Sequence, residues 1–228
     1  MNDKTNMENT SQENTSQDNS GQDNTNQNNI NKFNTISTAT DNNPFDKEIH
    51  KQLFKLALDS GFTYAAWISP AKIPFAPELR SLCEQNACGK YGSSWKGPPA
   101  IGPVEELMQE VIQYKNGLIV QTVGQMEDSF DYESMVETEE EHQDHFFELV
   151  REIKYNHPVL QDQMLALTVG CCHICDNCTY PDSPCIRPDE AFASVEAYGI
   201  NVNVMLTAGG LKYNNGPNTV SYVGLVLF

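Results

Sequence analysis

Five of the seven cysteines in this chain of 228 residues lie between Gly170 and Pro188. Cys172, Cys175 and Cys178 are separated by two residues each, and Cys185 follows after six more. A C-x2-C-x2-C run lets three thiolates converge from one tight loop, and a fourth thiolate then completes the ligand set of an iron–sulfur cluster. The spacing therefore predicts a [4Fe-4S] cluster held by Cys172, Cys175, Cys178 and Cys185.

Two other uses of these cysteines are open to a chain with this spacing. Zinc is the main alternative, although it prefers two C-x2-C pairs held well apart so that four ligands can form a tetrahedron. A disulfide framework needs an oxidising compartment, and we expect none, because no apolar secretion signal follows the N-terminal Met1. His173 lies inside the loop, but four thiolates suffice without it.

A second pair of cysteines, Cys83 and Cys88, precedes a loop rich in glycine, proline and aromatic residues. Two cysteines with four residues between them do not define a metal site, because an unpaired buried cysteine also serves as a small hydrophobic residue. His142 and His145 stand one helical turn apart, with acidic neighbours. They have no third ligand at a defined spacing, so we expect no metal there.

The charge of the chain restricts its partners. The formal net charge is -17, from 31 acidic and 14 basic residues, and such a surface repels phosphate backbones and anionic lipid. We therefore expect no binding to nucleic acid or to a membrane, and no apolar run reaches the ~18 residues that a membrane span needs. An acidic surface suits a cytoplasmic redox protein that docks on a basic patch of a partner protein, although acidity also serves solubility alone.

The chain divides by composition at residue 43. Residues 1–43 are dominated by Asn, Gln, Ser, Thr and Asp, a composition that predicts a disordered tail. Residues 44–228 are enough for one compact domain with a sizeable core, which would be the cysteine-rich metal-binding domain. The sequence does not indicate an oligomeric state.

The elements that must position the cysteines follow from periodicity and from turn residues. A strand over 164–169 leads directly into the cysteine loop, so the metal would lie at a strand end, where functional loops are common. The other predicted strands are 63–69 (a buried strand), 118–123 and 219–228, and the predicted helices are 46–60, 78–82, 103–117, 188–198 and 202–207. A capping box at Thr138 and Glu141 predicts the start of one more helix, whose inward stripe is Phe146, Leu149, Val150 and Ile153. This alternation predicts a single layered α/β or α+β domain with a mixed sheet of about four strands flanked by helices.

Four segments together resemble the DUF2284 family of predicted metal-binding proteins. The first reads Cys-Gly-Lys-Tyr-Gly-Ser-Ser-Trp-Lys-Gly-Pro-Pro-Ala-Ile-Gly over 88–102, and the others are 170–188, 194–200 and 210–219. The resemblance spans roughly residues 60–228 and implies metal binding, but it carries no established reaction.

The chain departs from the family pattern in two places. Relatives have a cysteine before the Pro-Pro pair, where this chain has Gly97, and a small residue where this chain has Cys171. One hypothesis is that Cys171 joins Cys83 and Cys88 in a three-thiolate site beside the four-thiolate one. The alternative is that the metal site at Cys83 and Cys88 has been lost.

Three classes of function fit these residues. The leading hypothesis is a redox accessory protein whose [4Fe-4S] cluster passes single electrons to a partner protein. A zinc-stabilised protein-binding module is the second, and a metalloenzyme with an open coordination position near Cys83 and Cys88 is the third. No catalytic residue can be named, because the chain has no G-x-G-x-x-G, P-loop, H-E-x-x-H or G-x-S-x-G motif.

Overall fold

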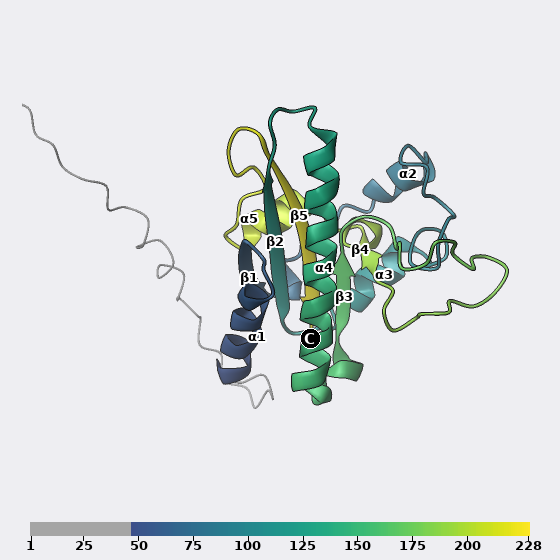
Figure 1. The fold of residues 1–228 in the computed structure, drawn as a ribbon. Coiled ribbons are helices and arrows are strands. Elements are labelled where there is room, and N and C mark those ends of the chain that lie inside the picture. Colours follow the sequence, from purple (N-terminus) through teal and green to yellow (C-terminus); the bar gives the residue numbers. More distant parts are fainter. Residues whose placement is uncertain (1–46) are drawn as a thin grey trace, which may run out of the picture. The chain divides into compact units, whose positions relative to one another are not determined.

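The computed structural model describes residues 47–228, and its centre is an open sheet of five strands in the order β1-β2-β5-β3-β4 (Figure 1). The strands are β1 (Tyr64–Ile68), β2 (Gly117–Gln125), β3 (Leu165–Thr168), β4 (Ala193–Ser194) and β5 (Thr219–Leu227). All neighbours are antiparallel except β3 and β4, which pair in parallel. The predicted mixed sheet is confirmed. The predicted tail, residues 1–43, lies outside the described residues.

Helices cover both faces of the sheet. The long α4 (Tyr132–Asn156) and α1 (Lys47–Asp59) lie on one face, and α3 (Val104–Val111) and α5 (Val202–Ala208) lie on the other (Figure 1). Successive residues of a strand point to opposite faces, so Leu118 and Val120 of β2 pack toward α4 while Ile119 packs toward α5. The short helices are α2 (Leu79–Glu84) and the 3-10 turns η1 (Pro70–Lys72), η2 (Pro158–Gln163) and η3 (Glu196–Tyr198). None of the helices between residues 47 and 228 is long and apolar enough to cross a membrane.

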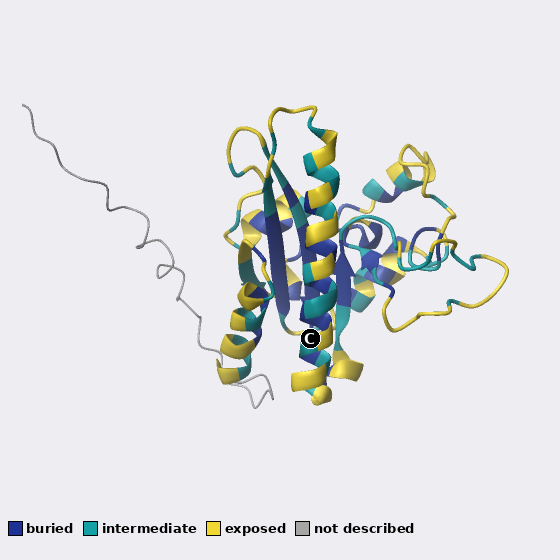
Figure 2. Cartoon of the chain, in the orientation of Figure 1, coloured by how far each residue is buried: buried dark blue, intermediate teal, exposed yellow. Residues whose placement is uncertain are grey.

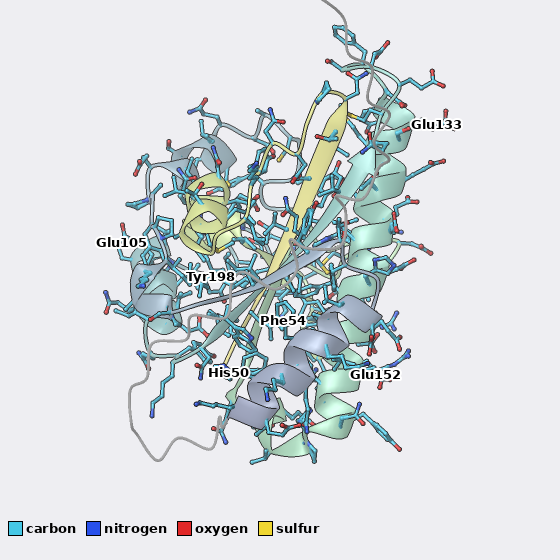
Figure 3. All side chains as sticks on the ribbon, turned by 90° about the vertical axis from the view of Figure 1, so that its left-hand side faces the viewer. His50, Phe54, Glu105, Glu133, Glu152 and Tyr198 are labelled. Carbon is cyan, nitrogen blue, oxygen red and sulfur yellow. The ribbon has the colours of Figure 1, made fainter. Side chains whose placement is uncertain are left out.

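Helix α4 packs closely against the two central strands. Its predicted inward stripe is buried, and the ring of Phe146 rests on Gly224 of β5, where an added Cβ would lie 2.5 Å from Cε2 of that ring. Glu133 and Glu152 mark the two ends of the helix in Figure 3, and its outward face is largely exposed in Figure 2. The acidic residues of α4 therefore form mainly a solvated face.

The capping box predicted at Thr138 is wrong, because α4 begins six residues earlier, at Tyr132. Asp131 caps the helix by accepting a hydrogen bond from the backbone N–H of Ser134 at 3.1 Å. Thr138 lies in the helix interior and donates to the carbonyl oxygen of Ser134 at 2.7 Å. It fits there because the facing residue of β2 is Gly124, where any Cβ would overlap with the threonine hydroxyl.

Two further expectations need correction. The predicted helix over 188–198 is absent from the described residues: this segment contains β4 and then η3, so the sheet has five strands. Gly199, with φ of 68°, ends η3 in the left-handed conformation that glycine favours. The predicted strand over 63–69 forms as β1, but it is an edge strand in which only Ile68 is buried.

Candidate metal centre

The cysteine loop joins two strands at one edge of the sheet. It leaves β3 after Thr168, and it returns through β4, whose two residues pair with Leu167 and Thr168. Gly170 makes the first turn with φ of 68°, and an added Cβ there would lie 2.5 Å from Oε1 of Glu139 on α4. Both ends of the loop are therefore fixed by the same strand. Figure 1 shows the loop projecting beyond β4, at the opposite edge of the sheet from β1.

The four cysteines of the C-x2-C-x2-C-x6-C run line one cavity. All four are half-buried and none forms a disulfide. Burial raises the pKa of the Cys172 thiol; a hydrogen bond from the backbone of Ile174 opposes this, and the nearby thiols of Cys178, Cys185 and Cys175 raise the pKa further. The loop therefore brings Cys172, Cys175, Cys178 and Cys185 to one place, as the spacing predicts.

The thiols surround this cavity without converging on a single point. Across residues 47–228, no three His, Cys, Asp or Glu side chains are close enough together to hold one metal ion. A zinc ion binds its thiolates at about 2.3 Å, which puts the four sulfur atoms of a tetrahedral site about 3.8 Å apart. In a [4Fe-4S] cluster each thiolate binds a different iron atom, so the sulfur atoms lie farther apart around a larger group. Four thiols that line one cavity are compatible with either kind of centre.

A segment from the first cysteine region holds the loop in place. The indole Nε1 of Trp95 donates to the carbonyl oxygen of Ser183 at 2.8 Å, across 88 positions of the sequence. Its ring also meets Tyr180 edge to face, with 5.0 Å between ring centroids. Trp95 lines the cavity of the four cysteines, as does its neighbour Lys96. Trp95 thus both packs the loop and lines the cavity, and the sequence alone singled out neither Trp95 nor Lys96 for this role.

Cys83 and Cys88 approach the same loop from the other side. Arg80 of α2 is nearly buried and donates to the carbonyl oxygens of Ala197 and Gly102, both at 2.7 Å, so the helix that carries Cys83 is fixed to η3. Burial raises the pKa of the Cys83 thiol; the Arg80 guanidinium opposes this, and Cys88 and Glu196 raise the pKa further.

Cys171 lies between the two groups of cysteines. Burial raises the pKa of its thiol, and the thiols of Cys88, Cys83 and Cys172 add to this, while the ammonium group of Lys90 opposes it. The side chain is half-buried. The thiol of Cys171 is thus close enough to interact electrostatically with Cys83 and Cys88, and also with Cys172.

The model of one protein family matches residues 66–228, a segment that includes all seven cysteines, and its description is "Predicted metal-binding protein (DUF2284)". The chain belongs to the DUF2284 family. No curated protein and no solved structure matches it. Residues 47–65, which form α1 and the start of β1, precede the DUF2284 match.

Two charged groups of the DUF2284 domain lie beside the cysteines. Arg187 lines the cavity of the four cysteines and forms an ion pair with Glu190. Lys90 acts on the thiol of Cys171. His173 is exposed, and its Nδ1 lies 3.2 Å from the carbonyl oxygen of Cys171. Its ring centroid lies 6.3 Å from that of Phe147.

The two histidines of α4 lie in an aromatic cluster. His142 is fully buried, and its Nδ1 lies 2.9 Å from Oγ1 of Thr122 on β2. Its other ring nitrogen has no hydrogen-bond partner among the described residues. Both His142 and His145 meet the ring of Phe62 edge to face. Burial, with a further contribution from His145, lowers the pKa of His142 to about 3, so this imidazole is neutral at neutral pH.

Proposed function

We propose that Cys172, Cys175, Cys178 and Cys185 hold a [4Fe-4S] cluster and that the protein transfers single electrons to a redox partner protein. The observation that supports this most is that the four thiols line one cavity, in a C-x2-C-x2-C-x6-C spacing that is typical of cluster ligation. A cluster bound by four cysteines supplies one-electron chemistry and leaves no iron open to a substrate.

The residues around the cavity have separate tasks in this proposal. Trp95, Ile174 and Ala191 form its apolar wall and limit the access of water. Lys96 and Arg187 bring positive charge to a site whose four thiolates are negative. Charged groups and limited access of water around an iron–sulfur site tune its reduction potential.

A partner protein can reach this site directly. Ile186 lines the cavity and is 66 % exposed, so the site lies close to the surface. Because the chain has a net charge of -17, we propose that the partner presents a basic surface. Free thiols persist in a reducing compartment, and all seven cysteines are unpaired, which supports the cytoplasm as the location.

Metal and acid-labile sulfide, measured on protein purified without oxygen, test this proposal. We expect a brown protein with about four irons and four sulfides per chain and broad absorption at about 400 nm. Colourless protein with about one zinc and no sulfide would instead support a zinc-stabilised binding module. In that case the proposed electron transfer would be wrong.

We further propose that Cys171 joins Cys83 and Cys88 in a second metal site, whose three thiolates must move closer together on binding, because no three such side chains in residues 47–228 are already close enough to hold one ion. The support is the electrostatic coupling of Cys171 to both of these thiols, together with the buried Arg80 that fixes the position of α2. Three thiolates would leave one coordination position open, where a non-cysteine ligand or a substrate can bind.

Cys171→Ala separates this second site from the first. If the second site binds metal, we expect wild-type protein to hold more metal than one cluster accounts for, and the variant to lose only that excess. The count of iron, zinc and sulfide per chain measures it. Unchanged stoichiometry in Cys171→Ala would contradict the compensation by Cys171 and favour the loss of metal binding at Cys83 and Cys88.

A further inference from the structure

A larger cavity adjoins the one that the four cysteines line. Its volume is about 380 Å³, within the range of small-molecule sites in proteins. The two cavities share Trp95, Lys96 and Ala191 as lining residues. A molecule in the larger cavity would therefore lie next to the candidate metal centre, separated from it by these three residues.

The larger cavity exists because β4 is so short. The two residues of β4 pair only with Leu167 and Thr168, so within residues 47–228 no strand lies beside Met164–Ala166 on that side of β3. Met164, which precedes β3, forms one wall of the cavity together with Leu165 and Ala166 of β3, and Leu107 of α3 and Phe192 contribute further apolar surface. The cavity thus has an apolar wall built on rigid elements of the fold.

Four charged residues line the same cavity: the half-buried Lys96, Lys154 and Glu110, and the exposed Asp189. Glu110 already accepts a hydrogen bond from the hydroxyl of the buried Tyr198, with 3.3 Å between the oxygen atoms; Figure 3 shows Tyr198 beside α3. Lys154 donates to the backbone carbonyl of Asp189 at 3.0 Å.

The two lysines leave positive charge available to a ligand. Among the described residues, Lys96 has neither a hydrogen-bond acceptor nor a carboxylate partner, and Lys154 has no carboxylate partner. Both lysine residues are half-buried, and lysine commonly buries its methylene stem while its charge stays accessible. An anion that enters the cavity would gain charge-assisted hydrogen bonds from both lysines.

We propose that this cavity binds a small organic carboxylate with an apolar body. The carboxylate pairs with Lys96 and Lys154, and the apolar body packs on β3 and Phe192. The carboxylate of Glu110 accepts the hydroxyl hydrogen of Tyr198 and repels a second carboxylate, which directs the ligand's carboxylate toward the lysines. This proposal does not depend on which metal the cysteines hold, because Lys154, Glu110 and β3 do not line the cysteine cavity.

Calorimetric titration of the full-length, metal-loaded protein with pairs of probes tests the proposal. Each pair consists of a carboxylate and its neutral amide: hexanoate, phenylacetate and 2-naphthoate with the corresponding amides. We expect at least one carboxylate to bind with a dissociation constant of about 1 mM or tighter, and its amide to bind about ten times more weakly, since a hydrogen bond to a charged group is lost. No binding by any carboxylate, or equal binding by acid and amide, would overturn the proposal.

Two variants and a control test whether the ligand's carboxylate binds at Lys96 and Lys154. Lys154→Met and Lys96→Met remove the charge but keep an unbranched side chain, and each should weaken binding about tenfold. The control is Lys51→Met, at an exposed residue of α1, which should leave binding unchanged. Lys96 also lines the cysteine cavity, so its variant is compared at equal metal content, and Lys96→Arg should restore binding. Wild-type affinity in both methionine variants would show that the anion does not bind at these lysines.

Discussion

Cys175→Ala is expected to lose the iron and sulfide of the main loop almost completely, together with the absorption at about 400 nm. Cys175 is the middle cysteine of the C-x2-C-x2-C run, and its side chain lines the shared cavity. Alanine offers no ligand, so one iron would be left without a thiolate, and the three remaining cysteines would hold the cluster poorly. Because a ligand that binds only the folded state stabilises it, the variant should also melt at a lower temperature than loaded wild-type protein.

His173→Ala is the matched control for this experiment. His173 lies in the same loop, two residues before Cys175, but its side chain is exposed and contacts the backbone of Cys171. We expect this variant to keep its iron, its sulfide and its spectrum. If Cys175→Ala retained about four irons per chain, the assignment of the ligands would be wrong, and if His173→Ala lost the cluster, the imidazole would have to be counted among the ligands.

The protein is expected to lose stability as the pH falls below about 6.5, and His142 is a main cause. Its pKa in the folded protein is about 3, well below the ordinary value of about 6.5 that the unfolded chain has. Between these values the unfolded state binds a proton that the folded state does not. The free energy of unfolding therefore falls by about 1.4 kcal/mol per pH unit from this residue, or by about 3 kcal/mol at pH 4. Above about pH 6.5 the residue adds no pH dependence.

Urea unfolding of His142→Gln, followed from pH 7 to pH 4, measures this contribution. Glutamine is polar and does not titrate, so the variant should show a shallower loss of stability than wild-type protein. His157→Gln, at the half-buried end of α4, is the control for the removal of one imidazole. Acid also protonates the 31 carboxylates, so only the difference between the two variants is diagnostic. Equal slopes would mean that water reaches His142 in the folded state.

Patterns of apolar residues that extend over four or more positions predicted most of the fold. The four strands expected from apolar runs form as β1, β2, β3 and β5, because each run extends over at least four residues in the sheet. The two-residue β4 has no such pattern. Pro188 and Gly199 favour the two ends of a helix, but tertiary pairing with β3 overrides this preference. The sequence held a weak signal of this strand, since the apolar residues Ala191, Ala193 and Val195 stand at every second position. All three are buried.

The sequence named the four cysteines of the candidate site, whose metal binding stays a prediction, but it did not name their surroundings. The spacing of four cysteines named a set whose members line one cavity. The support from Trp95 and Lys96 could not be read in the same way, because these residues lie at least 76 positions before Cys172 and reach the loop only through the fold. The same holds for the capping of α4, where the pattern at Thr138 reflects a close fit to Gly124 rather than a helix start.

The way in which the cysteine loop is attached bears on the maturation of the protein. Its two ends are fixed by β3 and β4, and none of the core residues that the structure describes is a cysteine. The sheet and its helices can therefore form before any metal arrives, unlike a zinc finger, which folds around its ion. Newly made protein would then have a folded sheet and an empty cysteine loop. Insertion of a cofactor would be a separate, later step that a cell can delay, catalyse or reverse.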